Sequence, residues 1–340
     1  MTLPKRFGTL ADGTPVDLYT LTNRNGLVVK ITNFGGRITE LHVPDRKGKL
    51  GNITLGHDQL KPYTLPKEPY LGTLVGRVAN RIAKGRFVVD GKTYTVPLND
   101  GPNALHGGPR GFDKAVWKAK ASGNSLVLSY LSPDGEMGFP GNLQAQVTYT
   151  LSDDNALRID YTAVTDKPTC VNLTNHAYFN FKGPGSGDIL SHEIMIAADR
   201  YTPVDAALIP TGEIAAVKGT HLDLSAMTRI GTYIAELTRG YDHNYVLNNP
   251  GEASPAATVY EPTTGRVMEV FTDQPGLQLY TGSFLDGSVH GLGGTYNKHG
   301  GFCLETQGFP DASNHPNFPS IVLRPGERYQ QFGLFKFSTR

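Results

Sequence analysis

Strict alternation of apolar and polar residues is the feature that most restricts what this chain can fold into. Apolar side chains occupy every second position from Leu143 to Leu151, and again from Leu157 to Ala163 after a turn at Ser152 to Asn155. Because successive side chains of a strand point to opposite faces, this pattern predicts two strands joined as a hairpin.

Other segments repeat this β pattern. FVVDGKTYTV, Phe87 to Val96, places Asp-Gly between two β-rich arms and predicts a second hairpin. Val267 to Thr272 and Leu277 to Ser283 are further candidate strands around the turn at Asp273 to Gly276. The 40 glycines and 23 prolines supply turns for many short strands. Helical spacing is clear only from Met227 to Leu237, behind a possible Ser225 cap, so one short helix is expected there.

No linker of biased composition, repeat of fixed period or low-complexity tract divides the 340 residues. Two antiparallel sheets together bury one face of many amphipathic strands. We therefore expect residues 1–340 to form a single all-β domain, a large antiparallel β-sandwich with few short helices.

Charge is almost balanced, with 32 Lys and Arg against 31 Asp and Glu and a formal net charge of +1. Such a chain has no global field to attract nucleic acid or an anionic membrane. No apolar run approaches the ~18 residues of a membrane span, and the stretch from Met1 to Leu10 is followed by no apolar signal region. We expect a cytoplasmic protein whose partner is a neutral small molecule.

Cys170 and Cys303 are the only cysteines, too few for a disulfide scaffold, and both are interpreted as reduced core residues. Neither has a metal-binding spacing, HExxH is absent, and no two histidines cluster with a carboxylate along the sequence. The glycine patterns of nucleotide-binding loops and the GxSxG elbow are absent too. The motifs therefore support neither metal nor nucleotide binding.

The segment NLTNHAYFNF, Asn172 to Phe181, reads as a strand with one largely apolar face. Its other face is neutral and polar, comprising Asn172, Thr174, His176, Tyr178 and Asn180. Asn, Thr and Tyr side chains both donate and accept hydrogen bonds, which suits a ligand rich in hydroxyl groups. His176 is therefore either a hydrogen-bonded structural residue or the catalytic group of a hydroxyl-binding face.

Glu305 is the only charged residue between Gly300 and Pro310. Burying a lone carboxylate is costly, so it is either partly exposed or retained for a function. Similar alternatives apply to His106 in a loop rich in Gly and Pro, and to Asp242, which might simply cap a turn. A basic cluster forms either a phosphate patch or a solvated turn; its members are Arg77, Arg81, Lys84 and Arg86.

Together these segments resemble the aldose 1-epimerase, or galactose mutarotase, family. The motifs that carry the resemblance are GRVANRI (76–82), NALHGG (103–108), NLTNHAYFN (172–180), YDHNY (241–245), LQLYTGSF (277–284) and LETQGFPDASNHPNFPS (304–320). They extend over nearly the whole chain in the order of the family. NHAYFN together with TQGFPDASNHPNFP is highly specific, whereas GRVANRI or YDHNY alone is weak.

The resemblance implies a β-sandwich of the galactose mutarotase supersandwich type, with an open cleft that binds a free hexose without metal or organic cofactor. It implies Glu305 as general base, His176 as general acid and His106 as a second active-site histidine. Its implied sugar-binding residues are Asn80, Arg81, Asp242 and Gln278. Arg77 is not assigned to the sugar. We expect a monosaccharide as partner and a monomer or homodimer.

The implied reaction opens a cyclic hemiacetal, rotates the C1–C2 bond and recloses the ring. One group takes a proton from the anomeric hydroxyl while another gives a proton to the ring oxygen. Ordinary pKa values of about 4.3 for Glu and about 6.5 for His leave a pH interval with an ionised base and a charged acid. Tyr178 or Tyr280 is expected to lie against the sugar.

Three other functions fit some of these residues. A lectin would keep the cleft without the catalysis, although Glu305 together with His176 argues against it. A glycoside hydrolase would use Glu305 and Asp242 as a carboxylate pair around a scissile bond. A relative acting on sugar phosphates would need the basic cluster as its phosphate pocket.

Overall fold

The structure, a computed structural model, describes residues 4–340. The first three residues of the stretch from Met1 to Leu10, which has no predicted signal region after it, lie outside the described residues. Within that range the only α-helix is the single turn α1 (Leu60–Tyr63), and strands make up most of the regular structure. The predicted all-β class is confirmed. Short 3-10 turns lie at Ala83–Gly85, Phe112–Lys114, Glu136–Gly138, Ile230–Thr232 and Ala312–Asn314.

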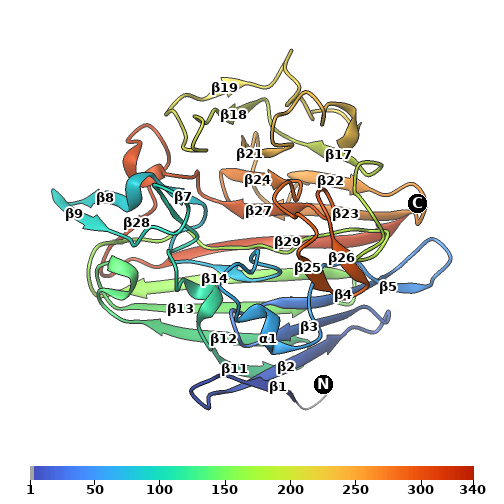
Figure 1. Ribbon diagram of the computed structural model, residues 1–340, viewed down its shortest axis with the longest axis horizontal. Coiled ribbons are helices and arrows are strands. Elements are labelled where there is room, and N and C mark those ends of the chain that lie inside the picture. The colour runs from blue at the N-terminus through green and yellow to red at the C-terminus, as the bar shows by residue number, and fades with distance from the viewer. Residues whose placement is uncertain (1–3) are drawn as a thin grey trace.

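The largest sheet crosses the middle of the molecule (Figure 1). Its order in the described chain is β11 (Lys118–Ser122), β12 (Ser125–Ser132), β13 (Leu143–Leu151), β14 (Ala156–Thr165), β29 (Tyr329–Thr339), β23 (Arg266–Thr272), β22 (Ala257–Tyr260), β17 (Glu193–Ile196) and β20 (Thr228–Arg229). All its pairs are antiparallel. The predicted hairpin from Leu143 to Ala163 is confirmed as β13–β14, with Val147 opposite Tyr161.

Two smaller antiparallel sheets accompany it. One is formed by β1 (Lys5–Thr9), β2 (Pro15–Thr22), β3 (Val28–Thr32), β4 (Ile38–Pro44) and β5 (Leu50–Asn52). The other runs in the order β19 (Ala215–Ala216), β18 (Arg200–Thr202), β21 (Asp242–Val246), β24 (Gly276–Tyr280) and β27 (Cys303–Gln307). This second sheet carries Asp242, Gln278 and Glu305 of the predicted site residues.

Short strand pairs connect and edge these sheets. They are β6 (Leu74–Val75) with β16 (Thr174–Asn175), β7 (Arg81–Ile82) with β10 (Ala104–Leu105), β8 (Arg86–Val89) with β9 (Lys92–Thr95), β15 (Thr169–Cys170) with β28 (Val322–Leu323), and β25 (Val289–Gly291) with β26 (Gly294–Tyr296). The predicted Asp90–Gly91 hairpin is β8–β9, and the positive φ of both turn residues (50° and 76°) explains the Asp-Gly pair.

The main apolar core lies between the large sheet and the two smaller ones. It joins Ile31 of β3, Ile159 of β14, Leu279 of β24 and Leu304 of β27 in one contiguous cluster. Each strand contributes alternate side chains, as the period-two pattern requires. The strands predicted on either side of Asp273 to Gly276 exist, but β23 belongs to the large sheet and β24 to the sheet of β27, so the chain changes sheet at this turn.

The helix expected from Met227 to Leu237 is wrong. Thr228 and Arg229 extend the large sheet as β20, opposite β17, and only the 3-10 turn Ile230–Thr232 follows. Ile230 is fully buried, whereas Met227 is exposed, so the apolar residues do not share one helical face. Elsewhere, no helix of the described residues is long and apolar enough to cross a bilayer.

Candidate active site

The paired strands β24 and β27 separate apolar from polar side chains. Both strands are buried along their length. Leu279 and Leu304 enter the main core, so the alternation turns Glu305 to the opposite face, directly across from Gln278. Glu305 is 2% exposed. The interpretation of Glu305 as a partly exposed residue is therefore wrong.

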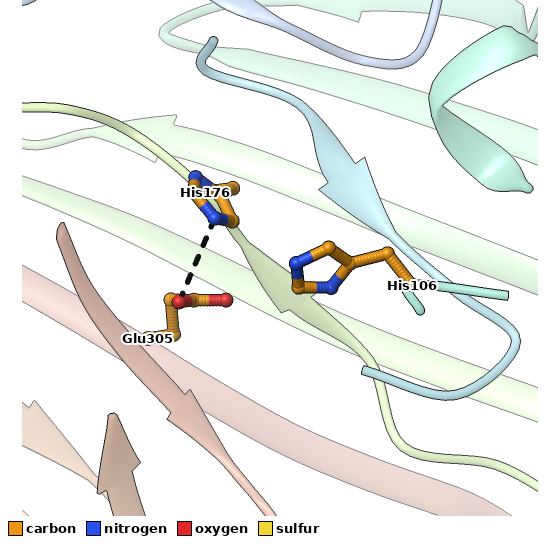
Figure 2. Close-up of side chains that lie close together, drawn as sticks. All are labelled: His106, His176 and Glu305. Carbon is orange, nitrogen blue, oxygen red and sulfur yellow. Dashed lines mark ion pairs between the residues drawn. The ribbon is translucent and has the colours of Figure 1, made fainter. Parts of the chain in front are cut away.

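His176 faces Glu305 from the segment that follows β16. Its backbone N–H donates to the carbonyl of Thr73, and its own carbonyl accepts the N–H of Gly72. These bonds tie the segment to the chain that precedes β6. Nε2 of His176 lies 3.7 Å from Oε1 of Glu305, and both side chains are almost fully buried (Figure 2).

The polar face expected from Asn172 to Asn180 is only partly correct. His176 and Tyr178 line the pocket. The Asn172 amide instead bonds both the N–H and the carbonyl of Gly308, and the Asn180 amide donates to the carbonyls of Gly187 and Gly300. These asparagines therefore satisfy buried backbone groups rather than a ligand.

His106 completes a compact cluster with His176 and Glu305 (Figure 2). It sits at φ 52° in the loop after β10, and its ring stands perpendicular to that of His176 at a centroid distance of 5.2 Å. Its Nδ1 accepts the backbone N–H of Asn80. A neutral His106 ring therefore carries its hydrogen on Nε2.

Two imidazoles and a carboxylate this close invite a comparison with a metal site, because one ligand atom from each lies within 4.8 Å of the others. The fold thus builds a cluster that sequence spacing did not reveal. A histidine ligand normally donates its other ring N–H to an acceptor. Nδ1 of His106 instead faces the Asn80 N–H, a donor. This arrangement suits a hydrogen-bond donor better than a metal ligand.

The cluster lies in a pocket of about 230 Å³. Its walls bring together most of the residues singled out in the sequence, namely Asn80, Arg81, His106, His176, Asp242 and Glu305, with the aromatic rings of Tyr178 and Tyr280. A larger hollow of about 630 Å³ lies over β11–β14. That hollow is lined by no histidine or carboxylate, so the smaller pocket is the candidate site.

Gln278 lies behind the pocket rather than in its wall. Its amide nitrogen donates to Oδ1 of Asp242 at 2.7 Å, which orients that carboxylate. Arg81 pairs with Asp100 at 2.7 Å. The pocket wall therefore combines one cation, Arg81, with the carboxyl groups of Asp100, Asp242 and Glu305.

The basic cluster does not form one surface. Arg77 is buried and donates to Ser132 and to the carbonyls of Pro133 and Pro140. Arg81 alone among the four lines the pocket, where it is paired with Asp100. Nothing in this arrangement resembles a phosphate patch.

Burial shifts the pKa of every titratable group in the cluster towards its neutral form. The pKa of Glu305 is raised well above its usual value by burial and by the Asp242 charge, with Arg81 opposing. Burial lowers the pKa of His176 to about 4. Burial, with His176 and Arg81 adding, lowers that of His106 well below 6.5. The ionised base and charged acid expected from ordinary pKa values are therefore not the favoured state of the empty pocket.

Five residues of the pocket were assigned no role from the sequence: Pro69, Tyr70, Asp100, Leu105 and Phe284. Tyr70 has φ 62° and packs its ring 4.7 Å from His106 and 6.0 Å from His176. The only signal for it was its position six residues before the GRVANRI motif. Asp100 lies in a turn-rich segment without a distinctive pattern, whereas Phe284 is the last residue of the LQLYTGSF motif.

A family model described as aldose 1-epimerase matches residues 17–336. Galactose mutarotase of Rattus norvegicus is 51% identical over 335 residues, which cover 98% of this chain and 97% of the relative. Aldose 1-epimerase of Escherichia coli (strain K12) is 39% identical over 335 residues, 96% of each chain.

Solved structures agree with these matches. Galactose 1-epimerase from Lactobacillus acidophilus superimposes with a TM-score of 0.86 at 30% identity, covering 99% of this chain and 98% of the other. A GalM/aldose epimerase homologue from C. elegans gives 0.87 at 30% identity, covering 95% and 99%. The similarity therefore includes the strands that carry the pocket as well as the outer sheets.

Proposed function

The chain belongs to the aldose 1-epimerase family, and from this premise we propose which residues carry out each step of the reaction. The protein is an isomerase that interconverts the α and β anomers of free aldohexoses. Galactose and glucose are the proposed substrates, handled without metal or organic cofactor. The names of its relatives support galactose.

Glu305 is the general base and His176 the general acid. In ring opening, Glu305 takes the proton of the anomeric hydroxyl while Nε2 of His176 gives a proton to the ring oxygen. The two sugar oxygens are bonded to one carbon, so base and acid must lie a few ångström apart. The observation that carries the proposal is the 3.7 Å separation of Oε1 and Nε2 inside one pocket. In ring closure the two residues exchange roles.

The shifted pKa values define where the reactive proton rests. With Glu305 favoured as the acid form and His176 as the neutral ring, the pair holds one proton more than a carboxylate with a neutral ring. The reactive carboxylate and imidazolium hold the same number of protons, so forming them needs no net uptake from solvent. An imidazolium with a low pKa is a strong acid, and a carboxylate with a high pKa is a strong base.

Four further residues hold the sugar. Arg81 and Asp242 offer charge-assisted hydrogen bonds, about twice as strong as neutral ones, to ring hydroxyls. Asn80 adds amide donors and acceptors, and His106 directs an Nε2–H donor. Gln278 acts through Asp242, which it already holds at 2.7 Å. Tyr178 and Tyr280 form an apolar wall suited to the C–H face of a pyranose.

The remaining properties follow from the chain as a whole. We propose that residues 1–340 act as one domain, because one apolar core joins strands from β2 to β29. We also propose a cytoplasmic monomer or homodimer in hexose metabolism, in keeping with the near-neutral charge.

Polarimetry on freshly dissolved α-galactose tests the reaction. The protein should accelerate the decay of optical rotation, and it should leave methyl α-galactoside unchanged because that sugar cannot open its ring. A decay at the uncatalysed rate would leave only sugar binding, as in a lectin. Release of reducing sugar from an aryl galactoside would instead indicate a hydrolase.

A further inference from the structure

Cys303 and Glu305 hold the two nitrogens of one imidazole ring. They are two residues apart on β27, so both side chains point to the same face of the strand. Sγ of Cys303 lies 3.4 Å from Nδ1 of His176, and Oε1 of Glu305 lies 3.7 Å from Nε2. The ring is therefore contacted at both ends by a single strand.

Among the described residues, no other side chain forms a hydrogen bond with Nδ1 of His176. The hydroxyl of Tyr178 donates to the carbonyl of Pro69, and that of Tyr280 accepts the N–H of Phe284. The carbonyl of His176 itself already accepts the Gly72 N–H. Among the side chains of the described residues, Cys303 is thus the hydrogen-bond partner of this ring nitrogen.

The thiol keeps its hydrogen in this position. Cys303 is fully buried, and burial, with the charges of Glu305 and Asp242, raises its pKa well above 9. An S–H group donates weakly and sulfur accepts weakly, so the thiol can serve either form of the ring. It donates to Nδ1 of the neutral ring and turns to accept Nδ1–H when the ring is charged.

We propose that Cys303 is a positioning residue that orients His176, so that the hydrogen on Nε2 points at Glu305 and the ring oxygen of the sugar. The proposal rests on the acid role of His176 proposed above. It is independent of any chemistry at sulfur, since the thiol neither gains nor loses its proton.

The choice of a thiol has a chemical consequence. A carboxylate behind Nδ1 would orient the ring equally well, but its charge would raise the imidazole pKa and weaken the acid. An uncharged thiol orients the ring without that penalty. The pocket thus combines a fixed ring with an imidazolium that gives up its proton readily.

Substitution at both cysteines tests the proposal with a matched control. Cys303→Ala removes the donor and Cys303→Ser restores one. As the control, Cys170→Ala makes the same truncation at a buried cysteine in a separate apolar cluster. Loss of one hydrogen bond of this kind predicts that kcat for galactose falls roughly 5- to 10-fold in Cys303→Ala. KM should stay near the wild-type value, and Cys303→Ser should recover most of the loss. Cys170→Ala should keep the wild-type kcat.

A spectroscopic measurement separates orientation from packing and from turnover. ¹⁵N NMR of protein labelled at histidine should show the hydrogen of neutral His176 on Nε2, with its signals identified by their loss in His176→Asn. Cys303→Ala should mix the two tautomers, and Cys170→Ala should not. Wild-type tautomers in Cys303→Ala, or equal losses of kcat and thermal stability in both alanine variants, would overturn the proposal. If wild type had no mutarotase activity but Cys303→Ala still altered the His176 tautomer, the proposed function would be refuted while the role of Cys303 in orienting the ring would stand.

Discussion

Replacing Glu305 by glutamine separates a catalytic carboxylate from a structural one, because activity and stability should move in opposite directions. The amide has nearly the same shape but cannot take up the anomeric proton. General base catalysis contributes about 10²- to 10⁴-fold, so kcat should fall by that factor, equivalent to roughly 2.7 to 5.5 kcal/mol. Galactose binding should persist.

The stability change follows from the burial of Glu305. Its Oε2 is buried and accepts no hydrogen bond within the described residues, and the same holds for Oε1 of Gln278 across the strand pair. A buried polar atom without a partner costs about 1–3 kcal/mol. An amide at position 305 supplies a donor at every pH and has no charge to lose on burial, so Glu305→Gln should be more stable than wild type by about that amount at pH 8.

The stability difference between Glu305→Gln and wild type should depend on pH. The folded pKa of Glu305 is raised above the ordinary value of about 4.3, so the stability given by the protonated form is lost as pH rises through the folded pKa. The advantage of the variant should therefore be present at pH 8 and vanish near pH 4. Urea unfolding at both pH values and polarimetry provide the measurements, with the exposed Glu213→Gln as control. A rate near wild type, or a variant less stable than wild type at pH 8, would refute the reasoning.

Three other substitutions test separate parts of the account. His176→Asn should lower kcat about 10²- to 10⁴-fold with little change in the thermal unfolding midpoint; unfolding of the variant instead would assign His176 a structural role. His192 is fully buried, its Nε2 accepts the N–H of Phe181, and burial lowers its pKa to about 3. The stability that a lowered histidine pKa provides is present above about pH 6.5 and is lost below it. Between pH 7.5 and 5, the free energy of unfolding of His192→Gln in urea titrations should therefore fall by about 2 kcal/mol less than that of wild type. Equal decreases in the two proteins would contradict this assignment. Glu68→Gln leaves Arg37 buried without its charged partner at 2.9 Å. The free energy of unfolding should therefore fall by about 3 kcal/mol or more. A decrease below about 1 kcal/mol would contradict this expectation.

Local patterns predicted the strands whose environment is uniform along their length. β13 and β14 keep one face in the core over their full length, so every second residue carries the signal. The Asp90–Gly91 turn was visible because its backbone angles favour that residue pair. At Met227 to Leu237 the spacing misled, because pairing with β17 outweighed a weak helical preference in a segment containing Gly231.

The pocket was partly visible because its motifs are short and local. Glu305 stood out as a lone charge in an apolar segment, and His176 as an imidazole on a neutral polar face. The roles of Asn172 and Asn180 were not predictable from alternation, since both bond backbone groups of distant segments.

Residues positioned by tertiary contacts alone were missed. Tyr70 reaches the pocket because Glu68 accepts its backbone N–H and pairs with buried Arg37. Cys303 was interpreted as a reduced core residue, and only the approach of His176 from a separate segment reveals its contact with the imidazole. Sequence spacing encodes neither approach.

A crystal structure of Glu305→Gln with galactose would show whether Glu305 and His176 contact the reacting oxygens, because the variant should bind the sugar without turning it over. We expect the anomeric hydroxyl at hydrogen-bond distance from the side chain at position 305 and the ring oxygen at hydrogen-bond distance from Nε2 of His176. A galactose whose C1 and ring oxygen face solvent, or one bound outside this pocket, would contradict this expectation.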